Sequence, residues 1–153
     1  MYRLIYCLLF VVMVSPAHAQ SSEDYALMAS TAYAAFACST LVDKYERPED
    51  RQSLLDLGYE RGKTFLMAME EGQVETEHVY RSVPLAFLDK LDPWAGAKLP
   101  SVDFRLGAVW ERALTSIEQL LIESSGGPQF AAKIEFNKRN CGTLLAIARQ
   151  ELR

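Results

Sequence analysis

The apolar residues along this chain are spaced as they are in α-helices. The segment from Glu23 to Tyr45 has no glycine or proline and is rich in alanine. Apolar residues three and four positions apart fall on one helix face. On the face of this first predicted helix lie Ala34, Cys38, Leu41 and Tyr45. Ser22 is the expected N-cap. Two acidic residues follow it in the first turn, where their negative charge interacts favourably with the helix dipole.

A second helix is predicted from Pro48 to about Glu71, with Gly72 ending it. Proline suits the first position of a helix because the amide hydrogen that it lacks would have no partner there. The main apolar stripe of this helix consists of Leu54, Gly58, Phe65 and Met69, with Leu55, Gly62 and Leu66 beside it.

The segment from Glu75 to Leu91 contains Pro84, which a straight helix does not accommodate. We therefore expect a short turn ending near Ser82 and a second short helix from Val83. Residues 92–101, which read DPWAGAKLPS, are predicted to form a loop because two prolines and a glycine interrupt the pattern.

Two further helices complete the pattern. Ser101 and Asp103 open the first of them, whose apolar stripe is Leu106, Trp110, Ala113, Ile117 and Leu121. The last helix begins at Pro128 and is predicted to be continuous. One side of it carries Phe130, Ile134, Cys141, Leu144, Ala148 and Leu152. Since no segment sustains a period of two, the sequence predicts an all-α protein, a compact bundle of about five helices.

The N-terminal residues have the pattern of an export signal. Arg3 is followed by an apolar run from Leu4 to Val14, and Ala17-His18-Ala19 matches the pattern that signal peptidase cleaves. The run is too short to span a bilayer, which needs roughly twenty helical residues. We therefore expect residues 1–19 to be a cleaved secretory signal peptide, residues 20–153 to form a single helical domain, and the mature protein to be periplasmic or secreted.

The cysteines agree with export. Cys7 lies in the predicted signal peptide, which leaves Cys38 and Cys141 as a pair in the mature chain. In an exported protein such a pair favours one disulfide, here between the first and last helices. Closing a loop of about a hundred residues contributes on the order of 4–5 kcal/mol in the chain-entropy model. Two free thiols are the alternative.

Charge argues against several classes of partner. The formal net charge of −4 becomes −5 once Arg3 leaves with the signal peptide. The basic residues are scattered, whereas nucleic-acid binding needs a clustered positive surface. The chain also lacks the basic amphipathic stripe of a membrane-surface helix, and we expect no integral membrane segment after processing.

The sequence GYERGKTF at residues 58–65 looks like a phosphate-binding loop. That motif needs four residues between its glycines, a strand before it and a helix after it. Only three residues separate Gly58 from Gly62, and the preceding residues continue a helical stripe. We interpret the two glycines as a helix-packing strip, because they lie one turn apart and glycine in a helix costs roughly 1 kcal/mol relative to alanine.

Candidate chemistry is sparse elsewhere. His78 is the one histidine after the signal peptide, and acidic residues flank it. Metal binding is not expected, because no second histidine or free thiol completes a zinc site and the acids around Gly72 lack a calcium-loop pattern. No cofactor is expected. Asn137 lies one turn before Cys141 and is expected to be buried, as a helix contact or a pocket residue.

Trp94 is the candidate binding residue, since it lies in the predicted loop and belongs to no helical stripe. The alternative is that Trp94 covers the core.

We expect a non-enzymatic module that binds another envelope protein, as an inhibitor, immunity or chaperone-like protein does. The open alternatives are a small hydrolase that uses His78 and nearby carboxylates, and a carrier of a small apolar ligand.

Overall fold

The computed structural model describes residues 20–43, 48–90 and 100–151. The predicted signal peptide, Tyr45, Leu152 and Trp94 lie outside these ranges. The described residues form seven helices and no strand, so the all-α prediction is confirmed. The helices are α1 (Ser22–Asp43), α2 (Pro48–Glu70), α3 (Thr76–Ser82), α4 (Leu85–Leu88), α5 (Val102–Glu123), α6 (Pro128–Lys138) and α7 (Cys141–Glu151).

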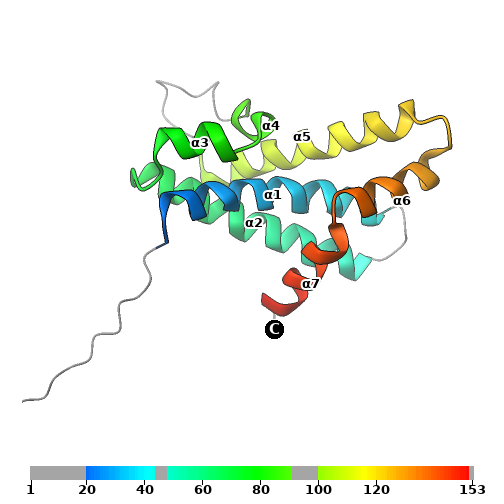
Figure 1. The fold of residues 1–153 in the computed structure, drawn as a ribbon, viewed down its shortest axis with the longest axis horizontal. Coiled ribbons are helices and arrows are strands. Elements are labelled where there is room, and N and C mark those ends of the chain that lie inside the picture. The colour runs from blue at the N-terminus through cyan, green and yellow to red at the C-terminus, as the bar shows by residue number, and fades with distance from the viewer. Residues whose placement is uncertain (1–19, 44–47, 91–99, 152–153) are drawn as a thin grey trace, which may run out of the picture.

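Helix α1 lies at the centre of the bundle. It runs beside α2 along the long axis of the molecule, and α5 lies along the same direction (Figure 1). The short helices α3 and α4 lie at one end, and α6 and α7 return from the other end (Figure 1). Because α1 contacts α2, α3, α5, α6 and α7, most of its surface is buried.

This central position explains the apolar composition of α1. Among the described residues, one stretch, Ser22–Val42, is long and apolar enough to cross a membrane. Two-thirds of it, 67%, is buried inside the protein. Alanine dominates its buried positions, and such small side chains let neighbouring helices approach it closely from several sides.

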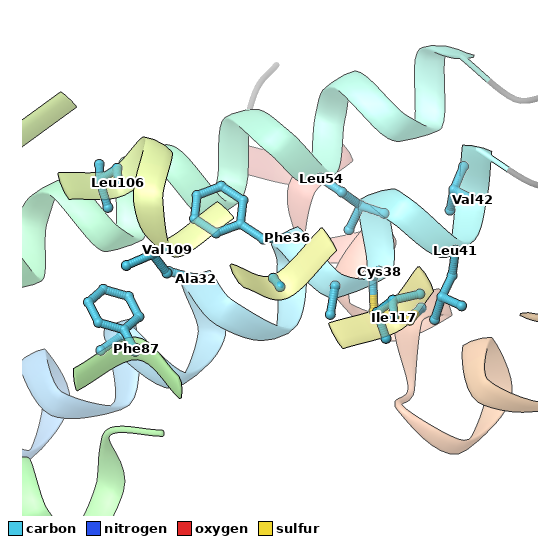
Figure 2. Packing of buried hydrophobic residues seen from close by; sticks show 14 of the residues in the cluster. Ala32, Phe36, Cys38, Leu41, Val42, Leu54, Phe87, Leu106, Val109 and Ile117 are labelled. Carbon is cyan, nitrogen blue, oxygen red and sulfur yellow. A yellow bond between two sulfur atoms is a disulfide. The ribbon is translucent and has the colours of Figure 1, made fainter. Parts of the chain in front are cut away.

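Aromatic rings join the helices around α1. Phe65 of α2 and Phe87 of α4 meet edge to face, with ring centroids 5.5 Å apart. Phe36 of α1 lies beside Leu106 of α5 in the same core, and Val109 continues it toward Phe87 (Figure 2). Pro84 separates α3 from α4 as the sequence predicts, and this break allows Phe87 to point inward.

The start of α1 differs from the prediction in its capping residue. Ser21 Oγ accepts a hydrogen bond from the Asp24 amide, and the Asp24 carboxylate accepts hydrogen bonds from the Ser21 amide and hydroxyl. These bonds lower the pKa of Asp24. Ser22, the predicted N-cap, is instead the first residue of the helix. The side chain of Ser22 is therefore free to contact another element, α3.

The predicted last helix is in fact two. Helix α6 ends at Lys138, Asn140 adopts a left-handed φ of 54°, and α7 begins at Cys141. Asparagine tolerates this conformation better than most residues. Because of this break, the apolar faces of α6 and α7 do not form one continuous face. As a result Phe130 and Ile134, predicted to face the core, are 61% and 48% exposed.

Helix α6 packs against the bundle through other residues. Ala131, Ala132 and Glu135 are its buried residues, and Glu135 pairs with Arg139 at 3.0 Å and Lys138 at 3.3 Å. Asn137 is exposed, so the prediction that it is buried is wrong. Met69, at the end of the predicted α2 stripe, is also exposed, at 38%.

The predicted disulfide is present. Cys38 and Cys141 are both fully buried and bonded, which joins α1 to the first residue of α7 across 103 positions of sequence. A disulfide of this kind is typical of an oxidising compartment. It also fixes the chain immediately after the break at Asn140.

Ion pairs brace the same end of the bundle. Arg149 of α7 pairs with Asp50 in the first turn of α2, and Arg61 of α2 pairs with Glu151 of α7. The two pairs differ in burial, because Asp50 is 2% exposed while Arg61 and Glu151 are both partly exposed. A third pair lies toward the other end of α2, where Glu70 meets Arg105, which is buried in α5.

Candidate functional site

A groove between α2 and α5 gathers aromatic and acidic side chains. Its volume is about 310 Å³, and its floor reaches down to α1. The lining residues are Phe36, Leu55, Asp56, Tyr59, Asp103, Leu106, Gly107 and Trp110. Three of these residues are aromatic, two are carboxylates and none is basic. The groove therefore combines apolar contact surface with negative charge.

One hydrogen bond crosses the groove. The Tyr59 hydroxyl of α2 donates to the Asp103 carboxylate of α5 at 2.6 Å. This bond, followed by burial and by the negative charge of Asp103, raises the pKa of Tyr59. The same bond holds the tyrosine ring in place between the two helices.

The floor of the groove depends on the two glycines of the GYERGKTF segment. A Cβ on Gly58 would lie 2.6 Å from the Phe36 ring, and one on Gly62 would lie 2.5 Å from Leu106 Cδ2. Real Cβ atoms do not approach other atoms so closely, so glycine lets Phe36 and Leu106 pack directly onto the α2 backbone. The segment lies in the middle of α2, where the backbone amides are committed to helical hydrogen bonds and cannot bind phosphate.

The charges around the groove leave its negative character in place. Gln52 donates to Asp56 at 2.7 Å, which orients that carboxylate without neutralising it. The Lys63 ammonium lies 5.7 Å from the centre of the Tyr59 ring, outside the lining residues. This distance is within the range of a cation–π contact, about 6 Å. The arrangement suits the binding of an organic cation.

A larger hollow of about 710 Å³ lies between α1, α2 and α7. The ion pair between Arg61 and Glu151 lies in its wall, and Leu27 and Ile147 contribute apolar surface. The hollow ends at Gln20 and Glu151, which are the first and last described residues of the chain. The groove between α2 and α5 is smaller and is lined by residues of three helices, α1, α2 and α5.

His78 lies outside both hollows and has a polar partner. Its Nδ1 lies 2.8 Å from Ser22 Oγ and 3.9 Å from a Glu75 carboxylate oxygen, and its side chain is 22% exposed. Ser22 Oγ also accepts a hydrogen bond from the Glu75 amide at 2.7 Å. Serine, histidine and glutamate thus meet where α3 begins beside the start of α1.

The other acids around Gly72 are dispersed among separate partners. Glu70 pairs with Arg105, Glu71 accepts a hydrogen bond from Gln73, and Glu77 pairs with Arg81. Across residues 20–43, 48–90 and 100–151, no group of three or more metal-ligating side chains comes together. These acids therefore make ion pairs and hydrogen bonds at helix ends and between helices.

The groove was not predicted from the sequence, although several of its residues lie in segments with other predicted roles. Tyr59 belongs to the segment examined for phosphate binding, and Trp110 was assigned to the core stripe of α5, where it proves half-buried. A signal was present, since Asp56 and Tyr59 share one face of α2 and Asp103 and Trp110 share one face of α5. Trp94 lies outside the described residues, so its predicted role in binding stays a prediction.

Comparisons of the chain with models of protein families, with curated proteins and with solved structures gave no match.

Proposed function

We propose that this protein is an exported, non-enzymatic module that binds another protein of the cell envelope. The observation that carries the proposal is the aromatic groove between α2 and α5, on a bundle braced by a disulfide. Tyrosine and tryptophan are preferred anchors of protein interfaces, and a rigid scaffold lowers the entropy lost on binding. Export itself is inferred from the N-terminal pattern, with the disulfide in support.

Site-specific photo-crosslinking tests this proposal directly. Gly107 lines the groove, and a Cβ there would meet nothing within 4 Å, so a photoreactive amino acid fits at this position. Gly142 in α7 is equally open and lies away from the groove, which makes it the matched control. The mature, oxidised protein is incubated with envelope extract and irradiated. We expect one dominant adduct from position 107 that position 142 does not give.

Adducts of equal pattern from both positions, or none from either, would contradict binding through the groove. A parallel pull-down with wild-type protein and Trp94→Ala tests the loop predicted from the sequence. If the wild-type protein recovers the partner and Trp94→Ala does not, the interface would lie on residues 92–101 rather than on the groove.

One contact supports a second candidate, a small hydrolase. Ser22 Oγ and His78 Nδ1 are 2.8 Å apart, the spacing of a nucleophile and its base. The orientation differs from that of a catalytic triad, because Ser22 and Glu75 face the same ring nitrogen instead of opposite ones. A fluorophosphonate probe distinguishes the hydrolase from the non-enzymatic binding module. Labelling that Ser22→Ala abolishes would support the hydrolase, and an unlabelled wild-type protein would eliminate it.

The carrier hypothesis finds no comparable support. Both hollows described above are lined partly by charged side chains, whereas a carrier of a small apolar ligand needs an enclosed apolar cavity.

A further inference from the structure

We infer that the groove between α2 and α5 binds a lysine or arginine side chain of the partner protein. This inference rests on the proposed protein-binding function and specifies the chemistry of the contact. It is carried by two carboxylates, Asp56 of α2 and Asp103 of α5, in a lining that also contains the aromatic side chains of Tyr59 and Trp110.

The lining matches both parts of a long basic side chain. The methylene stem of lysine or arginine buries against aromatic and aliphatic surface while its charged head stays near water. Phe36, Leu106 and Trp110 supply that surface, and the two carboxylates lie at the more exposed α2 and α5 walls. A cation near an aromatic face is stabilised further by the ring quadrupole, and arginine can also pair bidentately with a carboxylate.

Charge excludes the opposite occupant. An acidic segment would bring its carboxylates beside Asp56 and Asp103, and none of the eight lining residues is basic. Lys63 of the same helix lies against the Tyr59 ring and is not among the lining residues. The overall negative charge of the mature chain further attracts a basic partner at low ionic strength.

The size of the groove favours one side chain over a free cofactor. Its volume of about 310 Å³ is at the lower end of the range for small-molecule sites, roughly 300–1,000 Å³. The Tyr59–Asp103 hydrogen bond spans it and limits how deeply an occupant can enter. A single extended side chain, presented by a protein segment that lies across the two helices, meets these limits.

The test uses the mature, oxidised protein and short synthetic peptides. The host is a capped glycine–serine pentapeptide with a central lysine or arginine, and norleucine and citrulline replace them as uncharged analogues. Binding is followed by NMR through the Trp110 indole N–H and the Tyr59 amide. We expect saturable shifts with lysine or arginine, and at least tenfold weaker binding with norleucine or citrulline.

Two double variants locate the site. Asp56→Asn with Asp103→Asn keeps the size of both side chains and an acceptor for Tyr59, and we expect it to weaken peptide binding at least tenfold. Glu23→Gln with Glu118→Gln removes the same charge from exposed positions outside the groove, and we expect it to bind as the wild type does. Circular dichroism and thermal melting confirm that each variant is folded. Equal binding by both double variants would overturn the inference.

The crosslinking and peptide-binding experiments together separate this inference from the proposed function. If the crosslinking experiment identifies a partner but no basic peptide binds, the inference fails and the protein-binding function stands. If basic peptides bind but no partner is crosslinked, the cation site stands and the proposed function fails. Tighter binding of choline than of any peptide would assign the groove to a free organic cation and overturn the commitment to a protein side chain.

Discussion

The Phe36 ring lies 2.6 Å from the position that a Cβ on Gly58 would occupy, so α1 packs onto the bare backbone of α2. The Ala32 carbonyl oxygen would lie 3.2 Å from the same Cβ. Phe36 is buried, and both neighbours belong to the central helix, which other helices hold in place. A side chain at position 58 therefore has to displace one helix from the other.

Gly58→Ala is expected to destabilise the protein even though alanine favours helices. Overpacking a core costs typically about 1–3 kcal/mol, which exceeds the roughly 1 kcal/mol gained in helix propensity. Gly62→Ala should cost less, because the Leu106 methyl group that it meets is the end of a flexible side chain. Chemical denaturation of each variant gives the change in free energy of unfolding.

Gly107→Ala is the matched control, because a Cβ there meets nothing within 4 Å. It should stabilise the protein by roughly 0.5–1 kcal/mol through helix propensity alone. If all three substitutions were stabilising, the close approach of α1 to α2 and of α5 to α2 would be wrong.

Two ion pairs between α2 and α7 are expected to differ in their contribution to stability. Arg149→Gln leaves the Asp50 carboxylate, 2% exposed, without its guanidinium partner in α7. Because Arg149 is itself 53% exposed, we expect a loss of about 1–3 kcal/mol rather than the 3–5 kcal/mol typical of fully buried pairs. Arg61→Gln breaks the more exposed pair with Glu151 and should cost less than about 1 kcal/mol.

Thermal and urea unfolding of the two variants measures this difference. Added salt should weaken the contribution of the Arg61 pair more than that of the Arg149 pair, since exposed charges are screened. Equal losses in both variants would show that the burial of Asp50 has no energetic consequence.

Reduction of the Cys38–Cys141 bond is expected to lower stability substantially. The bond spans 103 positions, for which the chain-entropy model gives an upper value of about 4–5 kcal/mol. The measurement compares urea unfolding of the oxidised wild type with that of Cys38→Ala/Cys141→Ala. Both proteins should show the helical circular dichroism signal before unfolding, because the bundle has an extensive apolar core. Coincident unfolding curves would contradict a stabilising role.

The hydrogen bond from Tyr59 to Asp103 gives an expected pH dependence. Since it raises the pKa of Tyr59 in the folded protein, its contribution to stability is complete below the tyrosine pKa of the unfolded chain. That contribution is lost as the pH rises through the higher pKa of the folded state. Asp103→Asn removes the carboxylate charge, so the titration midpoint of Tyr59 should fall toward its ordinary value.

NMR titration of the tyrosine ring carbons in the two proteins measures the midpoints. The reference is Tyr59 in the unfolded chain, measured in denaturant. An unchanged Tyr59 midpoint in Asp103→Asn would show that the hydrogen bond across the groove is absent in solution.

The helical segments, their period and the cysteine pairing could be predicted from the sequence, because each depends on local or compositional signals. Pro48 and Gly72 mark the ends of α2 through the backbone preferences of proline and glycine, and Gly72 does adopt a positive φ of 70°. Cys38 and Cys141 were the one pair left outside the predicted signal peptide, so their partnership required no knowledge of the fold.

The tertiary structure alone decided which helix faces meet. Phe130 and Ile134 continue the apolar period of Cys141, yet the left-handed turn at Asn140 separates their face from that of α7 and leaves them exposed. The groove likewise joins Tyr59 to Asp103, 44 positions apart, through the packing of α2 and α5 on α1. Periodicity assigns each residue to a face of its own helix. The neighbour of that face is set by the packing of all helices together. The sequence therefore predicted the all-α class, most helix ends and the disulfide, whereas the break at Asn140 and the site were decided by the folded bundle.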